Sequence, residues 1–469
     1  MRERAALQTA SVLAAVFAGS ASALGDKVRR AAARWGKSED ASLIPTGERV
    51  PLHAACYVNA AASVAFDFDD YLFAGHTGHS AVLGAIAFGE ASGAKGTDVL
   101  TAQIIGNEVG GRLGAAMLLG PHNGQMWTYI HALEGACVAG RFLGLDATQL
   151  THAIGIALAQ PPYPLSPAFF GPDSKALLAS APLVDGIRAA ELAAEGVTGA
   201  DDIIGDRNGM LQTMGTRPLP FVFSGFGRAW VTSSLAYKLY PGCAYVDTPV
   251  DAFNEIREAF SNKTGRALAV DDVERVRVEA SLFTAGMEAL ATPYRRRERI
   301  TPVDVNFSVG LSYGVLLASG EISGESLSGP SLAANRDLIL AVADRVTVEQ
   351  SAELSMDVGG LSDLGIDPAQ LFAGGEGLTL DEADFSAFQM RFPSRVTLTT
   401  TAGEEFTAEV RIPAGAPGRP LAEAREGVSR KFLSTARSRL ADPEGALEAV
   451  LAIDSSPDVR RVIDRVVAR

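Results

Sequence analysis

The sequence predicts a mainly α-helical fold, in which a large all-helical domain is followed by a smaller α/β domain. Over roughly the first 230 residues, apolar residues recur with the 3.6-residue period of a helix, and the connections between periodic segments are short. After about residue 240, alternating runs of β-branched residues appear instead. The 48 glycines and the aromatic content of only 7% favour helices that pack closely against one another.

The expected helices of the large domain are bounded by residues that begin or end a helix. Thr97 with Asp98 is a capping pair, and Pro161 with Pro162 ends a helix because proline has no backbone N–H to donate. We expect helical segments at 5–34, 54–66, 80–90, 97–120, 136–145, 146–160 and 175–195.

The first 25 residues admit two interpretations. A basic start, a short apolar run and an A-x-A-like end are typical of a signal peptide. The alternative is an amphipathic or buried first helix that ends at Gly19. No apolar run reaches roughly 18 residues, so the sequence predicts no membrane-spanning segment.

The α/β domain is expected at 240–412, after a first helical segment at 1–239 and before a C-terminal helical segment at 413–469 that returns to the first domain. Its strands are expected in three alternating runs, the last of which is a hairpin that turns at Ala402–Gly403. These runs are 273–281, 345–351 and 395–412, and a helix of small residues at 308–320 lies between the first two.

Charge and cysteine content restrict the partners of this protein. A net charge of −14 argues against nucleic acid and anionic membranes as partners, and an anionic substrate would need a local cluster of basic groups. The cysteines Cys56, Cys137 and Cys243 are too scattered for a disulfide framework and have no zinc-site spacing. We therefore expect a cytoplasmic protein.

Residues 65–93 contain the densest group of chemically active side chains. Three acids, two histidines and a natural helix N-cap occur here: Asp67, Asp69, Asp70, His76, His79 and Ser80. The N-terminus of the helix that follows suits an anion such as a carboxylate, because its N–H groups are unpaired and carry partial positive charge. This stretch is the candidate active site.

The acidic group at 67–70 has several possible functions. It could supply a general acid or base, a divalent-metal site, the acid of a helical terpene cyclase, or only a solvated helix end. His76 and His79 favour acid–base chemistry, and the sequence nominates no third ligand for a metal. The run GHSAV at 78–82 lacks the second glycine of a nucleophile elbow, which argues against a serine hydrolase.

Other polar residues are weaker candidates. His122 and His131 flank a Gly-rich loop, whereas His53 and His152 are expected to be structural. Lys175 opens a helix, where it could bind a carboxylate. The basic run at 294–299 is expected to be a solvated charge run, and no dinucleotide or phosphate-loop motif implies a nucleotide cofactor.

Several segments in sequence order resemble the MmgE/PrpD family, which includes 2-methylcitrate dehydratases, cis-aconitate decarboxylases and iminodisuccinate epimerases. The segments are 48–70, GNEVGGRLG at 106–114, GRFLGLDATQLTHAIGIALAQ at 140–160 and KLYPGCAYVDTPVDAF at 238–253. The resemblance implies a helical domain, a smaller α/β lid and an active site in the cleft between them. It also implies a homodimer that acts on small di- or tricarboxylates without a cofactor, and it favours a first helix that belongs to the mature protein.

Most site residues follow from the resemblance position by position; His79 has no counterpart in the family, and His131 is expected only as a replacement in space for a missing family histidine. The expected catalytic residues are Asp67, His76, Lys175 and Tyr294. The expected substrate-binding residues are Tyr71, His79, Met126, Thr128, His131, Lys238 and Cys243.

The chain also departs from the pattern of this family. Met126-Trp127-Thr128 stands where the family has H-P-T, and two further family histidines are replaced, one of them by Leu178. His122 or His131 could take the place of the missing loop histidine. We therefore expect a more apolar pocket and a less heavily charged substrate than in the dehydratases.

The predicted function is that of a cofactor-independent lyase or isomerase, which moves a proton next to a carboxylate in dehydration, decarboxylation or epimerisation. Lys175 would bind the carboxylate, Asp67 or His76 would be the acid or base, and Tyr294 would close the site. The alternative is a non-catalytic family member that binds a small acid or a protein partner.

Overall fold

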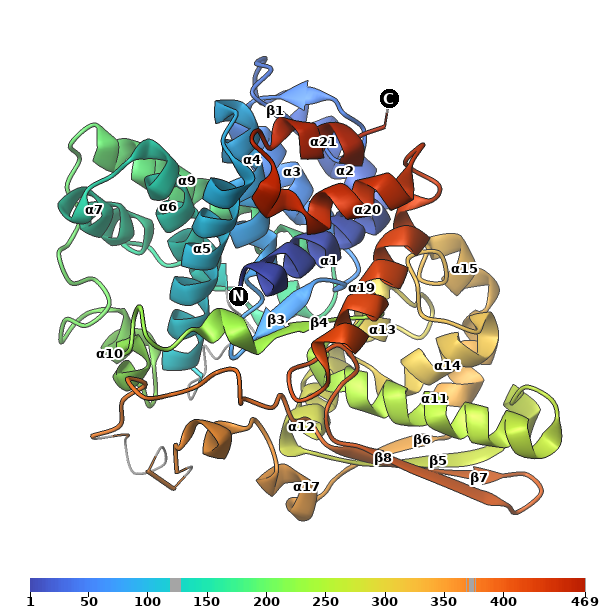
Figure 1. The fold of residues 1–469 in the computed structure, drawn as a ribbon. Helices are drawn as coiled ribbons and strands as arrows, with labels where there is room; N and C mark the ends of the chain where they lie inside the picture. Colours follow the sequence, from blue (N-terminus) through green and yellow to red (C-terminus); the bar gives the residue numbers. More distant parts are fainter. Residues whose placement is uncertain (119–127, 368, 371–374, 376, 469) are drawn as a thin grey trace.

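The computed structural model describes residues 1–118, 128–367, 369–370, 375 and 377–468. The protein is mainly α-helical, with 56% helix and 8% strand, which confirms the predicted fold class (Figure 1).

The helical body is built around α1 (Arg2–Ser20), which is buried without interruption from Ala5 to Phe17. It packs along α3 and α19, so the apolar N-terminal run is a core helix in this structure. Among the described helices none alone is long and apolar enough to cross a membrane, and α1 with α2 passes that test only as a pair bent by 89°. The other helices of the body are α2 (Ala23–Ala32), α3 (Leu52–Val64), α4 (Gly78–Ser92), α5 (Gly96–Ala116), α6 (Thr128–Leu143), α7 (Ala147–Ala157) and α9 (Ser180–Ala194).

Several predicted helix starts are wrong. The helix predicted from residue 136 is α6, which is already helical at Thr128. The helix α4 begins at Gly78 after Thr77, so Ser80 is not its N-cap; the Ser80 hydroxyl instead bonds to side chains of α6. The helix α5 begins after Lys95, which places Thr97 inside the helix. The segment predicted as one helix at 175–195 is divided into the 3-10 helix η2 (Asp173–Leu177) and α9.

The second part of the chain contains a four-stranded sheet in the order β6-β5-β7-β8. Its strands match the three predicted alternating runs: β5 (Val273–Ala280), β6 (Val346–Gln350), β7 (Ser394–Thr400) and β8 (Glu405–Val410). The hairpin β7–β8 turns where it was predicted, with Gly403 at a φ of 77° that favours glycine. The long helix α11 (Ala244–Thr264) packs against β7 and β8, and the predicted helix of small residues is α14 (Val309–Ser319) (Figure 1).

Two connections bring distant segments to the acidic stretch. The strand β3 (Asp70–Leu72) pairs antiparallel with β4 (Leu235–Tyr237), which carries Lys238 to the acids. From the end of the chain, α19 (Leu421–Ala436) lies along α1, and its buried Lys431 donates hydrogen bonds to the carbonyl oxygens of Phe68 and Lys238 (Figure 1). The helices α20 (Pro443–Leu451) and α21 (Arg460–Val466) follow.

Candidate active site

The acidic loop between α3 and β3 is buried and is held by two lysines. Lys175 Nζ lies 2.8 Å from Asp67 Oδ2, and Lys238 bonds to both Asp67 and Asp69, at 3.0 Å from Asp69 Oδ1. Burial alone would raise the pKa of Asp67, but the ammonium groups of Lys175 and Lys238 hold this pKa below its usual value. Asp67 also has a left-handed φ of 53°, a conformation that the two ion pairs help to fix.

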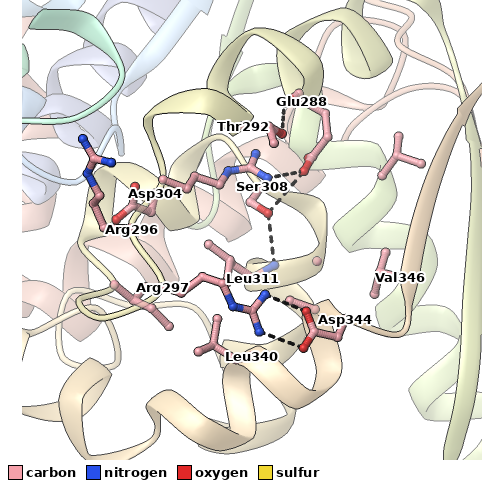
Figure 2. Close-up of a pocket in the computed structure, with 15 residues that line it drawn as sticks. Glu288, Thr292, Arg296, Arg297, Asp304, Ser308, Leu311, Leu340, Asp344 and Val346 are labelled. Carbon is pink, nitrogen blue, oxygen red and sulfur yellow. Dashed lines mark hydrogen bonds and ion pairs between the residues drawn. The ribbon is translucent and has the colours of Figure 1, made fainter. Parts of the chain in front are cut away.

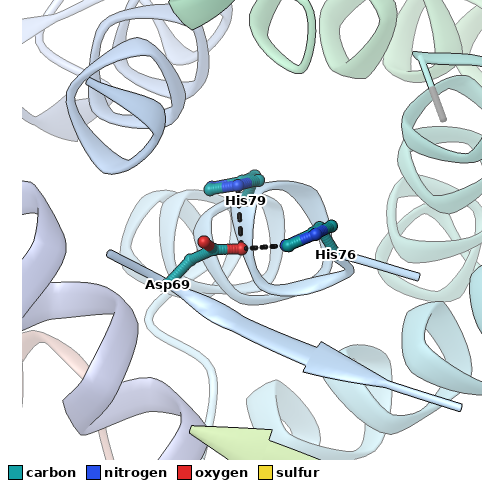
Figure 3. A group of neighbouring side chains, drawn as sticks. All are labelled: Asp69, His76 and His79. Atoms are coloured by element: carbon teal, nitrogen blue, oxygen red, sulfur yellow. Dashed lines mark hydrogen bonds and ion pairs between the residues drawn. The ribbon is translucent and has the colours of Figure 1, made fainter. Parts of the chain in front are cut away.

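Asp69 orients two imidazoles (Figure 3). Its Oδ2 atom lies 2.9 Å from His76 Nδ1 and 3.0 Å from His79 Nε2. Burial would raise the pKa of Asp69, but His79, Lys238 and His76 hold it well below the usual value, so Asp69 is an ionised acceptor. A His76 that donates from Nδ1 carries its lone pair on Nε2, and because burial lowers its pKa, this imidazole is suited to act as a base.

The same three side chains are also a candidate metal site, because one ligand atom from each lies within 4.8 Å of the others. The sequence did not nominate Asp69 as the third ligand. However, Asp69 Oδ2 already shares a hydrogen bond with His76 Nδ1 and lies 3.0 Å from His79 Nε2, and its Oδ1 atom is paired with the Lys238 ammonium. A divalent ion would have to displace both imidazole contacts beside a positive charge, so the arrangement fits acid–base chemistry better than metal binding.

A cavity of 60 Å³ opens onto this cluster. Seven of the predicted site residues line it: Asp67, His76, His79, Thr128, His131, Lys175 and Cys243. The other lining residues form an apolar wall and include Val64, Phe169, Leu178, Ala179 and Phe307. Burial raises the pKa of Cys243 to about 12, so its thiol is neutral. The cavity therefore combines imidazoles, one ammonium group and an apolar wall, in line with the expected less polar pocket.

Lys175 is the basic group of this lining. It is 5% exposed, and its Nζ atom lies 4.9 Å from the centroid of the Phe307 ring as well as beside Asp67. An ammonium group between a carboxylate and an aromatic face is held in place by charge on one side and by a cation–π contact on the other.

His131 enters the cavity from α6. Its Nδ1 atom lies 2.7 Å from Ser80 Oγ, and Ser80 also bonds to Glu134 one helical turn further along α6. Burial lowers the pKa of His131 well below its usual value, and the neighbouring His79 and His76 lower it further. His131 is therefore neutral in the resting site.

Three of the predicted site residues that the structure describes do not line the cavity. Lys238 is fully buried beneath the acids, where it supports Asp67 and Asp69. The Tyr71 hydroxyl donates to Asp247 at 3.4 Å. Tyr294 stacks on Phe170, with ring centroids 5.7 Å apart, and Phe170 in turn packs on the cavity residue Phe307. Met126 lies outside the described residues, as does His122.

Sequence reasoning missed two polar residues that complete the site, Ser63 and Glu134, and assigned Ser80 only as a helix N-cap. Ser63 Oγ lies 2.7 Å from His79 Nδ1, and Ser80 and Glu134 lie behind His131. Glu134 follows His131 by three residues and so lies on the same face of α6, but the helix was predicted only from residue 136, which hid this relationship.

A larger cavity of 480 Å³ lies in the second part of the chain, around the predicted basic run (Figure 2). Its charges are largely satisfied internally: Arg295 pairs with Glu288 at 2.6 Å, and Arg297 forms a bidentate pair with Asp344 at 2.7 and 2.8 Å. Residues 296–299 are exposed, as expected for a solvated charge run, and Arg295 is the half-buried arginine of the run. Among the described residues no histidine lines the larger cavity, and so we assign the chemistry to the smaller one.

Comparisons with known proteins agree with the resemblance read from the sequence. Residues 1–220 match the model of the MmgE/PrpD N-terminal domain. A cis-aconitate decarboxylase of Aspergillus terreus is 28% identical over 342 residues, which cover 68% of each chain. A cis-aconitate decarboxylase of Aspergillus terreus strain NIH 2624 is 29% identical over 261 residues, which cover 51% of this chain and 52% of the relative.

Proposed function

Since residues 1–220 match the model of the MmgE/PrpD N-terminal domain, we propose that this protein is a cofactor-independent lyase that acts on a small carboxylic acid in the cavity beside Asp69. The observation that carries the proposal is the meeting of His76, His131 and Lys175, from three separate elements, in the lining of that cavity. The named relatives support decarboxylation first, with dehydration and epimerisation as the other reactions of the same class.

The proposed reaction needs a cation, a proton acceptor and a proton donor. Lys175 binds the carboxylate and stabilises the negative charge that develops next to it. In decarboxylation, the C–C bond to the leaving carboxylate breaks, CO₂ departs, and the electron pair that stays on the substrate carbon takes a proton from an imidazole. In dehydration or epimerisation, His76 Nε2 first removes the proton next to the carboxylate.

The charge of the site limits the substrate. Asp67 and Asp69 balance the two ammonium groups of Lys175 and Lys238, so the cluster offers little excess positive charge. A cavity of 60 Å³ with an apolar wall also favours a small acid with one or two carboxylates over a tricarboxylate.

The test is to incubate the protein with a panel of small mono-, di- and tricarboxylic acids and to follow products by NMR. His76→Ala and Lys175→Ala should each lower kcat/KM by about 100-fold or more. His53→Ala and Lys27→Ala are matched controls, because these residues form ion pairs with Glu191 and Asp173 at exposed or half-buried positions. Turnover at the wild-type rate in both site variants would refute the assignment.

The same panel separates the enzyme from a binding protein. A non-catalytic family member would be stabilised against heat by one of the acids and would form no product. We also propose, from the resemblance, a homodimer and a cytoplasmic location; light scattering of the purified protein measures the first, and fractionation of the source cells measures the second.

A further inference from the structure

The helix α6 carries a buried carboxyl group that the proposed reaction has not yet used. Glu134 is 0% exposed, and within the described part of the chain its Oε1 atom has no hydrogen-bond partner. A carboxylate oxygen that is buried and unpaired is costly, which favours the neutral acid. Consistently, burial raises the pKa of Glu134 well above its usual value and nearby Asp70 raises it further, which outweighs the lowering effect of the contacts with Ser80 and the Ala81 backbone.

Ser80 bridges this acid to the imidazole of His131. Ser80 Oγ bonds to Glu134 Oε2 and lies 2.7 Å from His131 Nδ1, whereas Nδ1 and Oε2 are 3.7 Å apart, too far for a direct hydrogen bond. A serine hydroxyl can accept one hydrogen bond while it donates another. With the proton on Glu134, Ser80 accepts from the acid and donates to Nδ1, and the proton of the neutral His131 ring is then on Nε2.

This tautomer suits a proton donor at the cavity, but only if Nδ1 is protonated at the same time. A neutral imidazole that gave up its Nε2 proton without replacement would become an imidazolate, which is far too basic to form in this site. The Ser80 proton at Nδ1 supplies that replacement, and Glu134 replaces the proton of Ser80.

We propose that Glu134 supplies, through Ser80, the proton that His131 donates to the substrate carbon, so that Glu134, Ser80 and His131 form one proton relay. This inference rests on the proposed function. In the step, His131 Nε2–H protonates the carbon from which CO₂ has left, Ser80 gives its proton to His131 Nδ1, and Glu134 gives its proton to Ser80. His131 ends as the other neutral tautomer, and Glu134 ends as a carboxylate.

The charge of the site is conserved in this step. The negative charge that the substrate carboxylate brought in remains on the substrate carbon when CO₂ leaves, and it passes to Glu134 when that carbon is protonated. A proton from solvent at His131 Nε2 then resets the relay in the reverse direction after the product has left.

Glu134→Gln tests the relay because the amide keeps the shape of the acid but cannot pass on a proton. We expect kcat to fall by about 10- to 100-fold with KM within twofold of wild type. Ser80→Ala should show the same loss, and the double variant should lose no more than either single variant, because the residues act as one unit. Glu90→Gln and Ser92→Ala are matched controls on α4: Glu90 is a buried acid bonded to Ser42, and Ser92 bonds only to backbone.

A second measurement does not depend on turnover. In wild-type protein with ¹⁵N-labelled histidine, NMR at pH 7 should show His131 protonated at Nε2, and Ser80→Ala should change that tautomer ratio. Infrared difference spectra between wild type and Glu134→Gln should show a protonated carboxyl group.

The outcomes separate the two proposals. Turnover by wild type with an unchanged kcat in Glu134→Gln overturns the relay and leaves the lyase in place. If no acid of the panel is turned over, the proposed function fails and the relay is decided by the spectra alone: an ionised Glu134 or an Nδ1-protonated His131 at pH 7 overturns it.

Discussion

At the scale of single residues, Asp69 determines how the site works although it does not face the cavity itself. One of its oxygens bonds to His76 and contacts His79, and the other pairs with Lys238, so a single carboxylate positions two imidazoles and is an ionic partner of a buried ammonium group. The sequence showed three nearby acids but could not show which of them lies between the histidines, because that depends on the loop conformation around Asp67.

Asp69→Asn should therefore lower kcat by about 100-fold or more, because a neutral amide cannot hold both imidazoles as the carboxylate does. It should also destabilise the fold by roughly 3 kcal/mol, since Lys238 keeps only Asp67 as an ionic partner. Steady-state kinetics and urea unfolding measure the two effects. Asp98→Asn, which changes an exposed partner of Arg141, is the control; a wild-type kcat in Asp69→Asn would contradict the assigned role.

Glu134 gives a prediction about stability and pH. Its raised pKa means that, above about pH 4.5, the unfolded chain releases a proton that the folded protein keeps. Stability should then fall as pH rises from about 5 to 8, by up to about 1.4 kcal/mol per pH unit from this group. Glu134→Gln removes this loss, so the variant should gain stability relative to wild type as pH rises.

Urea unfolding at several pH values measures this slope. Glu426→Gln, at an exposed position on α19, is the control and should leave the slope unchanged. Parallel curves for wild type and Glu134→Gln would show that Glu134 is ionised in the folded protein.

At the scale of helices and strands, the hairpin and most helices of the body were predictable because their signals are local: a period of 3.6 or 2, and glycine at turns. The contacts that were not predictable join residues far apart in the sequence. Serine is a common N-cap residue, yet the Ser80 hydroxyl forms hydrogen bonds with His131 and Glu134, which are about 50 residues away in the sequence. No local pattern carries that information, and for the same reason the contact of Lys431 with the acidic loop could not be foreseen.

Close packing of α5 against α6 depends on glycine. A Cβ atom on Gly110 would lie 1.8 Å from Glu134 Oε1, whereas a Cβ atom on Gly286 in α12 (Leu282–Ala291) would meet nothing within 4 Å. Gly110→Ala should destabilise the protein by about 1–3 kcal/mol and also lower kcat, because Glu134 must move. Gly286→Ala should instead stabilise it by roughly 0.5–1 kcal/mol. Thermal unfolding and kinetics of the two variants check this opposite pair of effects.

At the scale of the whole molecule, the sequence led to the right fold class because the two parts differ in composition. The sequence predicted the residues of the site less completely. Seven predicted residues meet in one cavity, but Tyr294 is separated from it by Phe170 and Phe307, since the contacts between the two parts are set by packing over the whole chain.

The net charge of −14 leads to the last prediction. A negative substrate is repelled by the molecule as a whole, and the lysines of the site do not offset this field because Asp67 and Asp69 already pair with them. Salt shortens the Debye length from about 30 Å at 0.01 M to about 8 Å at 0.15 M, which screens the repulsion.

For a dicarboxylate substrate, kcat/KM should therefore rise by about two- to fivefold over this range while kcat stays constant. A monocarboxylate should show a smaller rise, and a neutral ester that inhibits the enzyme should bind equally well at both salt concentrations. A fall in kcat/KM with salt would mean instead that the substrate meets an excess of positive charge at Lys175 and Lys238, and that the two aspartates do not neutralise them.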